Sequence, residues 1–374
     1  MEKIQLIVEA KVCEAFEEKI SQMCRIKYKL PTIGLYVLEI PSTSGAEVDN
    51  IKAIEGVRSV RSDARITAQS SSLHEYTGAG VTIAILDTGI YPCADLMQPG
   101  RRVLGFVDFV NGKNRPYDDN AHGTHVACIA AGNGYQSGGQ YRGVAPEAGV
   151  VAIKILDEQG RGNTADALAG IEWIVNNQRR YNIRVANLSI GTEDTGSSDP
   201  LVRAVEAAWD AGIVVCVAAG NNGPAAKTVT SPGISRKAIT VGASDDFNQA
   251  DIWGNSLVNF SGRGPTSECI KKPDILAPGH DIISCLSKSP ELCAKRAAKL
   301  RVVSDNYVKM SGTSMSSPAV AGAAALLLQK YPKLCPDEVK LMLKKSARNM
   351  GQPANRQGWG EIDIVKLMET EAGI

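Results

Sequence analysis

Apolar and polar residues follow different patterns before and after about residue 70. In the first part, short runs alternate as in half-buried strands, and two stretches place apolar residues at helical spacing. In chain order, the pattern predicts strand 4–8, helix 12–23, strand 35–40, helix 46–54 and strand 57–67. This order fits a β-α-β-β-α-β unit, so we expect a small ferredoxin-like α+β domain over residues 1–68.

From residue 69 to residue 374, the apolar runs are continuous rather than alternating. The runs lie at 81–86, 150–155, 185–190, 213–218 and 238–241. Continuous runs are typical of strands that are buried on both faces of a parallel sheet, with helices between them. We therefore expect an α/β domain with a mostly parallel sheet over residues 69–374.

Helix signals separate these strands. Thr164 is predicted to cap a helix at 165–177, and Asp199 followed by Pro200 is predicted to begin another. Residues 318–329 are mostly Ala, Val, Gly and Leu, so this helix is apolar nearly all round and should lie buried in the centre of the domain. At about 12 residues, it is too short to span a membrane.

Three short segments carry the groups of an activated hydroxyl nucleophile. They are Asp87-Thr88-Gly89, His122-Gly123-Thr124-His125 and Gly312-Thr313-Ser314-Met315-Ser316-Ser317-Pro318. A serine hydroxyl needs an imidazole to accept its proton, and the imidazole needs a carboxylate to fix its tautomer. Asp87 follows an apolar run at the carboxyl edge of the expected sheet, where active sites of open α/β sheets gather. Ser314 precedes the small-residue helix, whose free N–H groups favour developing negative charge.

At these residues the chain resembles the subtilisin-like serine peptidases, in which the three groups follow the same order. The resemblance implies a three-layer catalytic domain that hydrolyses peptide bonds through an acyl-enzyme. It assigns the nucleophile to Ser314, the base to His122 and the orienting carboxylate to Asp87. Asn221, in Ala219-Gly220-Asn221, and the Ser314 amide would donate hydrogen bonds to the oxyanion. The chemistry needs neither a cofactor nor a metal, and the substrates are proteins or peptides.

The same resemblance implies where an extended substrate binds. Two segments would add the substrate to their edges through main-chain hydrogen bonds, and Gly220 would line one wall of the pocket for the residue before the cleaved bond. The residues concerned in the two segments are Ser189 and Gly191, and Gly160 and Gly162. In the alternative interpretation, these glycines only form turns.

The first domain resembles the inhibitory propeptide that precedes many subtilases. By this resemblance, residues 1–68 would inhibit the enzyme and be released by self-processing, which makes the chain a zymogen. The stretch 68–72, Ala-Gln-Ser-Ser-Ser, is small and polar and suits cleavage. An unrelated accessory domain is the alternative.

Three rival functions remain at this point. Asp-Thr-Gly also occurs at Asp194, so an aspartic protease with two carboxylates sharing a proton is one alternative. His122 and His125 have the i, i+3 spacing of a metal pair, although neither His74 nor His280 belongs to a recognisable ligand motif. The third alternative is a catalytically silent subtilase fold that serves as a binding or regulatory protein.

Charge, hydropathy and cysteines bound the surroundings of the protein. A net charge of +1 gives no reason to expect a nucleic-acid or membrane partner. The first residues lack the basic start and long apolar core of a signal peptide, so we expect a cytoplasmic protein. The nine cysteines are odd in number and irregularly spaced, so we expect no disulfide framework. Cys128 and Cys216 should behave as small buried hydrophobes.

Two segments differ from the compact secreted subtilases. Residues 132–142 replace a loop that often holds calcium, and they contain no carboxylate, so a structural calcium ion is not supported there. Residues 286–309 form a longer and basic segment before the serine motif. We expect a solvated helix there, with a rim that contacts the substrate or propeptide as the alternative.

Overall fold

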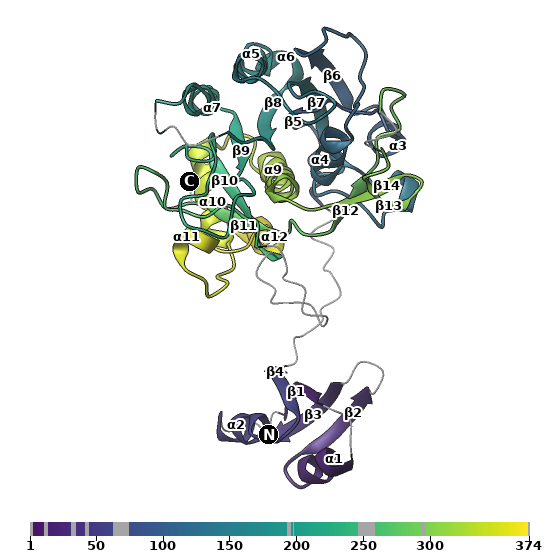
Figure 1. Ribbon diagram of the computed structural model, residues 1–374, viewed down its shortest axis with the longest axis vertical. Helices are drawn as coiled ribbons and strands as arrows, with labels where there is room; N and C mark the ends of the chain where they lie inside the picture. Colours follow the sequence, from purple (N-terminus) through teal and green to yellow (C-terminus); the bar gives the residue numbers. More distant parts are fainter. Residues whose placement is uncertain are drawn as a thin grey trace. The chain divides into compact units, whose positions relative to one another are not determined.

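The chain forms two compact units, Met1–Ser70 and Ser71–Ile374, each with its own hydrophobic core (Figure 1). The computed structural model describes residues 3–10, 14–30, 35–41, 45–62, 75–192, 196, 198–245, 259–292 and 297–372.

The first unit is an antiparallel sheet with two helices. Its elements are β1 (Lys3–Ala10), α1 (Glu14–Ser21), β2 (Arg25–Leu30), β3 (Leu35–Pro41), α2 (Gly45–Lys52) and β4 (Val57–Ser62). The strand order is β2-β3-β1-β4, and Val8 lies opposite Tyr36 in the buried centre. The predicted β-α-β-β-α-β order is confirmed, with β2 as the strand that the pattern had not located. Residues 63–67 of the last predicted strand lie outside the described residues.

A seven-stranded sheet forms the centre of the second unit. Across the sheet, its strands are β11 (Ile275–Ala277), β10 (Ile239–Ala243), β9 (Val214–Ala218), β8 (Ile183–Leu188), β5 (Thr82–Asp87), β7 (Gly149–Lys154) and β6 (Val103–Asp108). Neighbouring strands pair in parallel. The five predicted strands are confirmed, with ends displaced by one or two residues. The pattern missed β6, a partly exposed edge strand, and β11, which is three residues long.

Helices cover both faces of this sheet and give three layers (Figure 1). On one face lie α4 (His122–Ala131) and α9 (Thr313–Lys330), which also contact each other. On the other lie α5 (Thr164–Asn176) and α7 (Pro200–Asp210). The remaining helices are α3 (Ala94–Met97), η3 (Tyr135–Ser137), α6 (Gln178–Tyr181), α10 (Pro336–Ser346), α11 (Ala354–Gln357) and α12 (Ile364–Glu369).

The expected helix starts are partly confirmed. Asp199 caps α7 by accepting a hydrogen bond from the Leu201 amide at 2.8 Å. Thr164 does not cap α5, because Asn163 holds the N-cap position and Thr164 is the first helical residue. The central helix α9 begins five residues before the expected position, and its buried residues surround it, as its apolar composition predicts.

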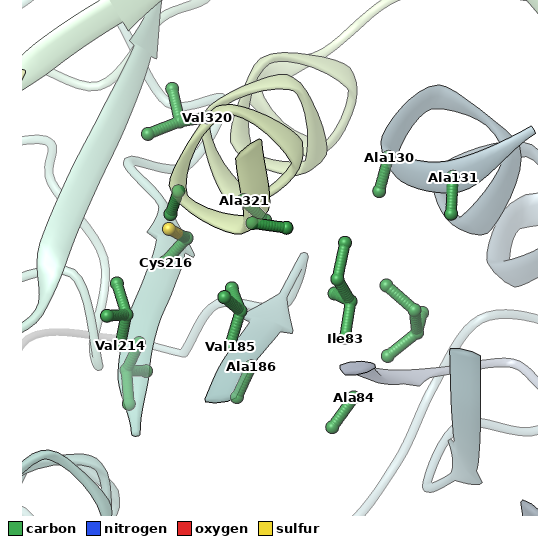
Figure 2. Close-up of a cluster of buried hydrophobic side chains, with 14 of the residues drawn as sticks. Ile83, Ala84, Ala130, Ala131, Val185, Ala186, Val214, Cys216, Val320 and Ala321 are labelled. Carbon is green, nitrogen blue, oxygen red and sulfur yellow. The ribbon is translucent and has the colours of Figure 1, made fainter. Parts of the chain in front are cut away.

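Small side chains let α4 and α9 approach the sheet closely. Ala130 of α4 and Ala321 of α9 lie on the face of the sheet from which Ile83 and Val185 project (Figure 2). Neighbouring strand residues such as Ala84 point to the opposite face, as the two-residue period of a strand requires. No helix among the described residues is long and apolar enough to cross a bilayer.

Residues 286–309 precede the serine motif, and a solvated helix was predicted there. This prediction is wrong for the described residues of the segment. There the chain forms β13 (Arg301–Ser304) and β14 (Tyr307–Met310), which join β12 (Ile282–Cys285) in an antiparallel sheet. The strand β14 is held because Tyr307 and Val308 are buried. Residues 293–296 lie outside the described part of the chain.

Candidate active site

The proposed catalytic carboxylate and imidazole are in direct contact. Asp87 is the last residue of β5, and His122 is the first residue of α4. The Oδ1 atom of Asp87 lies 2.7 Å from Nδ1 of His122. The backbone N–H of the next residue, Thr88, donates to the same oxygen. The carboxylate is buried, whereas the imidazole is 22% exposed. With Nδ1 bound to the carboxylate, Nε2 is the nitrogen at which this imidazole would accept a proton.

Close backbone contact at this pair depends on Gly123. A Cβ atom at Gly123 would lie 2.2 Å from the carbonyl oxygen of Gly89, so no larger residue fits without movement of the backbone. Gly123 therefore lets α4 begin close to the turn that follows Asp87. The residue before the helix, Ala121, has a φ of 80°, a left-handed conformation that is costly for a residue with a Cβ atom.

Asp118 holds the start of α4 in this conformation. Its Oδ1 atom accepts hydrogen bonds from the Ala121 amide at 2.9 Å and from the Thr88 hydroxyl at 2.9 Å. Its Oδ2 atom accepts from the amide and hydroxyl of Thr124, at 2.8 and 2.6 Å. One buried carboxylate thus ties the turn after Asp87 to the helix that carries His122.

Ser314 shares a cleft with His122. The cleft has a volume of about 540 Å³, and its wall includes Gly160, Gly162, Ser189 and Gly191. The structure therefore brings together the predicted base, the predicted nucleophile and both predicted substrate-binding segments. Gly220 and Asn221 are not among the described residues that line this cleft. Both contact Thr313, the residue before Ser314, instead.

Asn221 contacts Thr313, the residue before Ser314. Its Oδ1 atom accepts from the Thr313 amide at 2.9 Å and from the Thr313 hydroxyl at 3.1 Å, while the Gly220 amide lies 3.2 Å from that hydroxyl oxygen. Because Oδ1 accepts both bonds, the Nδ2 group is the end of the amide that remains for an oxyanion.

The carbonyl of Ser314 has an unusual partner. In a regular helix it would accept from the amide four residues later, but that residue is Pro318, which has no N–H. The hydroxyl of Ser189 donates to this carbonyl at 3.0 Å, and the Ser314 hydroxyl lies 3.4 Å from the Ser189 carbonyl. The first turn of α9 is thereby fixed to the substrate-binding segment that contains Ser189.

The rival metal pair is not formed. His125 is fully buried, and its Nε2 atom donates to the carbonyls of Ile282 and Val308 at 3.1 and 3.2 Å. Burial, and secondly the charge of protonated His122, lower the pKa of His125 to about 3. Among the described residues, no group of three metal-ligating side chains includes either histidine.

Comparison with known proteins identifies the family. Residues 78–360 match the sequence model of the subtilase family. The chain belongs to the subtilase family. Serine protease AprX of Bacillus subtilis (strain 168) is 47% identical over 317 residues, which cover 80% of this chain and 70% of AprX. Subtilisin DY of Bacillus licheniformis is 36% identical over 289 residues, covering 76% of this chain and 90% of that protein.

Solved structures agree with this membership. A cold-adapted subtilisin-like serine proteinase has a TM-score of 0.58 at 28% identity and covers 81% of this chain and 92% of its own. Fervidolysin from Fervidobacterium pennivorans shares the fold, with a TM-score of 0.64 at 22% identity over 99% of this chain and 61% of its own. The predicted subtilisin-like fold is confirmed, and the protein is a subtilisin-like serine protease, a hydrolase.

Membership also bears on the aspartic protease alternative. Asp194 lies outside the described residues. In this subtilase Asp87 pairs with an imidazole, which is the arrangement of an activated hydroxyl rather than of two carboxylates sharing a proton.

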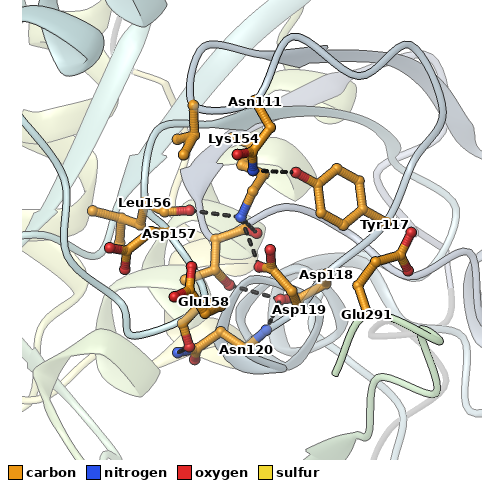
Figure 3. A network of polar contacts seen from close by, with 12 residues as sticks. Asn111, Tyr117, Asp118, Asp119, Asn120, Lys154, Leu156, Asp157, Glu158 and Glu291 are labelled. Carbon is orange, nitrogen blue, oxygen red and sulfur yellow. Dashed lines mark hydrogen bonds and ion pairs between the residues drawn. The ribbon is translucent and has the colours of Figure 1, made fainter. Parts of the chain in front are cut away.

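Sequence reasoning missed two charged groups beside the site. One is Asp118, which reads as a loop carboxylate although it lies within capping distance of the helix start. The other is Lys154, which is fully buried at the end of β7 (Figure 3). The signal for Lys154 was a single charge at the end of an otherwise apolar run.

Proposed function

We propose that this subtilase is a serine endopeptidase that cleaves peptide bonds through an acyl-enzyme at Ser314. The observation that carries the proposal is the 2.7 Å contact between Asp87 and His122 at the edge of the cleft that His122 and Ser314 both line. A carboxylate on Nδ1 keeps the imidazole in the tautomer whose Nε2 accepts a proton.

The reaction follows from these positions. Ser314 Oγ bonds to the carbonyl carbon of the substrate and its proton passes to Nε2 of His122. The C–N bond then breaks, and the leaving amine takes that proton. Water then attacks the acyl-enzyme and gives a proton to His122; the acyl C–O bond to Ser314 breaks, His122 returns that proton to Ser314 Oγ, and the carboxylic product leaves. Asp87 stabilises the imidazolium in both halves and does not itself take the proton.

Two donors would stabilise the oxyanion of each tetrahedral intermediate. The first is the Ser314 amide in the first turn of α9, where the helix dipole favours negative charge. The second is Nδ2 of Asn221, whose amide is oriented by Thr313. Loss of one such donor costs about 10²–10³ in turnover.

The substrates we propose are protein and peptide chains bound in extended form. The cleft runs between the segment that holds Gly160 and Gly162 and the segment that holds Ser189 and Gly191. Its described lining mixes apolar side chains with polar ones and includes one arginine, Arg161.

We further propose that the first unit acts as an inhibitory propeptide and that the chain processes itself. The support is that the first unit is compact and has its own hydrophobic core, separate from that of the peptidase unit. Self-processing requires the same chemistry at Ser314. If the enzyme is active but does not cut its own chain, only the propeptide proposal is contradicted.

Labelling with an alkyl fluorophosphonate tests the catalytic proposal. Only an activated hydroxyl reacts, so we expect one label on Ser314 of the wild type and none on Ser314→Ala or His122→Ala. Ser316→Ala is the matched control for a nearby hydroxyl and should retain labelling at Ser314. Casein hydrolysis by Ser314→Ala should fall by about 10⁶, as it does when subtilisin loses its corresponding serine.

Absence of labelling in folded, processed wild-type protein would instead favour the silent subtilase scaffold. Near-normal casein hydrolysis by Ser314→Ala would contradict the assignment of the nucleophile.

A further inference from the structure

Three thiols from distant parts of the sequence meet beside α4. Cys93 precedes α3, Cys128 lies on α4 and Cys285 ends β12. All three are buried, and their Sγ atoms all lie within 4.8 Å of one another. The closest recorded pair, Cys93 and Cys128, has its sulfurs 3.5 Å apart. Sequence spacing gave no sign of this convergence, and of the three only Cys128 had been expected to act as a small buried hydrophobe.

The separations suit three ligands of one thiophilic cation. With metal–sulfur bonds of about 2.3 Å, three sulfurs around one ion lie about 3.8–4.0 Å from one another. The cluster of Cys93, Cys128 and Cys285 therefore needs shifts of less than about 1 Å. A disulfide would use only two of the thiols and would need Cys93 and Cys128 to approach by about 1.5 Å.

Charged groups next to the cluster suit a divalent ion. Asp95 is fully buried, and its Oδ2 atom lies 3.3 Å from Sγ of Cys285 and 2.8 Å from the Tyr307 hydroxyl. The Arg102 guanidinium donates to the backbone carbonyls of Asp95 and Ala131. One divalent cation together with Arg102 would offset three of the four negative charges on three thiolates and the Asp95 carboxylate.

We propose that Cys93, Cys128 and Cys285 bind one d¹⁰ divalent cation of the zinc class through their three thiolates. Thiolates are the ligands that zinc-class cations prefer, and structural zinc sites are built largely from them. The site is separate from the hydrolytic cleft, and its ion would join α4, the helix that begins at His122, to α3 and to β12. Its role is therefore to stabilise the support of the imidazole rather than to take part in hydrolysis.

Cadmium titration tests this site without measuring activity. The background is the full-length chain with Ser314→Ala, to prevent autolysis, and with Cys269→Ser and Cys335→Ser, which remove the thiols that are exposed among the described residues. After reduction with a phosphine and treatment with a chelator, Cd²⁺ is added and the thiolate-to-cadmium charge-transfer absorbance is followed. We expect saturation at one equivalent, competition by Zn²⁺ and a higher melting temperature with either ion.

Two single substitutions separate the cluster from other buried thiols. Cys285→Ser should weaken cadmium binding by at least about 10-fold, because even loss of an outer partner of a metal site costs that much. Cys216→Ser removes a buried thiol that lies outside the cluster, so it should leave the titration unchanged. Cys128→Ala, checked for folding by circular dichroism, replaces Cys285→Ser if the latter does not fold.

Equal cadmium affinity in Cys285→Ser and Cys216→Ser would overturn the proposal. So would the absence of a charge-transfer band in the folded, reduced protein, whether or not Cys93 and Cys128 are found joined in a disulfide before reduction.

Discussion

Lys154 lies opposite Asp87 in the register of the parallel strands β7 and β5. The buried ammonium of Lys154 and the proposed catalytic carboxylate of Asp87 therefore lie at the same edge of the sheet, where both strands end. Nζ of Lys154 donates to the carbonyls of Thr88 and Leu156 and to Oδ1 of Asp119, each at 2.7 Å (Figure 3). Since Thr88 directly follows Asp87, this lysine holds the turn that presents the carboxylate to His122.

Removal of the Lys154 charge should strongly destabilise the peptidase unit. Lys154→Met leaves Asp119 and two carbonyls without their donor in a buried place, and loss of one partner of a buried ion pair costs about 3–5 kcal/mol. Burial already raises the pKa of Asp119, and the hydrogen bond from Lys154 is what opposes that shift. The free energy of unfolding in urea, measured in the Ser314→Ala chain, checks this prediction.

The matched control is Lys237→Met, which removes a lysine whose partner, Asp210, lies in an exposed ion pair. Exposed pairs contribute about 1 kcal/mol or less, so this variant should stay near the parent. A Lys154→Met variant that is no less stable than the Lys237→Met variant would contradict the structural role of the buried ammonium.

Asp118 should act on turnover through His122. Asp118→Ala removes the acceptor for Ala121 and Thr124 at the start of α4, so the imidazole loses its fixed position. A displacement of about 1 Å can cost about 10²-fold in rate. We expect kcat on a peptide substrate to fall by about that factor, with KM changed much less because the substrate-binding segments are untouched.

Asp108→Ala controls for the loss of any hydrogen-bonded carboxylate. Asp108 accepts from the amides of Val110 and Asn111 and from the Tyr117 hydroxyl, and it has no recorded bond to α4. This variant should lose stability but keep its kcat. A larger rise in KM than fall in kcat for Asp118→Ala would show that Asp118 does not position the imidazole.

The local motifs were predictable from the sequence, because each places its functional residue at the end of a short apolar run or the start of a helix. Asp87, His122 and Ser314 each needed only a few neighbouring residues to be recognised. The supporting groups depend on contacts between segments far apart in the chain. Lys154 looks like a surface charge until β7 is paired with β5, and Cys285 has no relation to Cys93 until β12 packs beside α3.

The prediction for residues 286–309, before the serine motif, was wrong for a similar reason. Its lysines and arginines suggested a solvated helix, but pairing with β12 stabilises β14 as a strand. Asp281 adds ion pairs to Arg301 and Lys309, at 2.7 and 3.4 Å. Strand formation here is thus a consequence of tertiary contacts, which local charge patterns do not contain.

His125 should make the folded state sensitive to mild acid. Its pKa is lowered from 6.5 to about 3, chiefly by burial, so between these values the unfolded chain binds the proton more readily. The contribution of neutral His125 is complete above pH 6.5 and is lost as the pH falls toward 3. Each pH unit in this window should cost up to about 1.4 kcal/mol.

His125→Gln tests this directly, since an amide can still donate to the carbonyls of Ile282 and Val308 but does not titrate. The slope of unfolding free energy against pH, measured between about pH 4 and 6 in the Ser314→Ala chain, should become shallower. His280→Gln, at a partly exposed position, should keep the parental slope. An unchanged slope in His125→Gln would show that other groups cause the acid sensitivity.

Self-processing should separate the two units of the chain. The peptidase unit carries the proposed nucleophile, and the segment from about residue 63 to 74 is tethered to it through Glu75. Because tethering replaces a bimolecular encounter, the first cut should be intramolecular, with a rate that does not change on dilution. Wild-type protein should be cut once between Ile66 and Ser72, which gives two fragments that intact mass can identify. Ser314→Ala should remain one chain.

Dilution and mixing distinguish self-processing from cleavage by a second molecule. A first-order rate that is constant over a 100-fold range of concentration supports the intramolecular route, whereas a rate proportional to concentration contradicts it. The released first unit has its own buried core, built around Val8, Tyr36 and Ile51, so it should stay folded and inhibit casein hydrolysis until it is degraded. Active wild-type enzyme with an intact N-terminus would refute self-processing, and so would cleavage of purified Ser314→Ala at the same position.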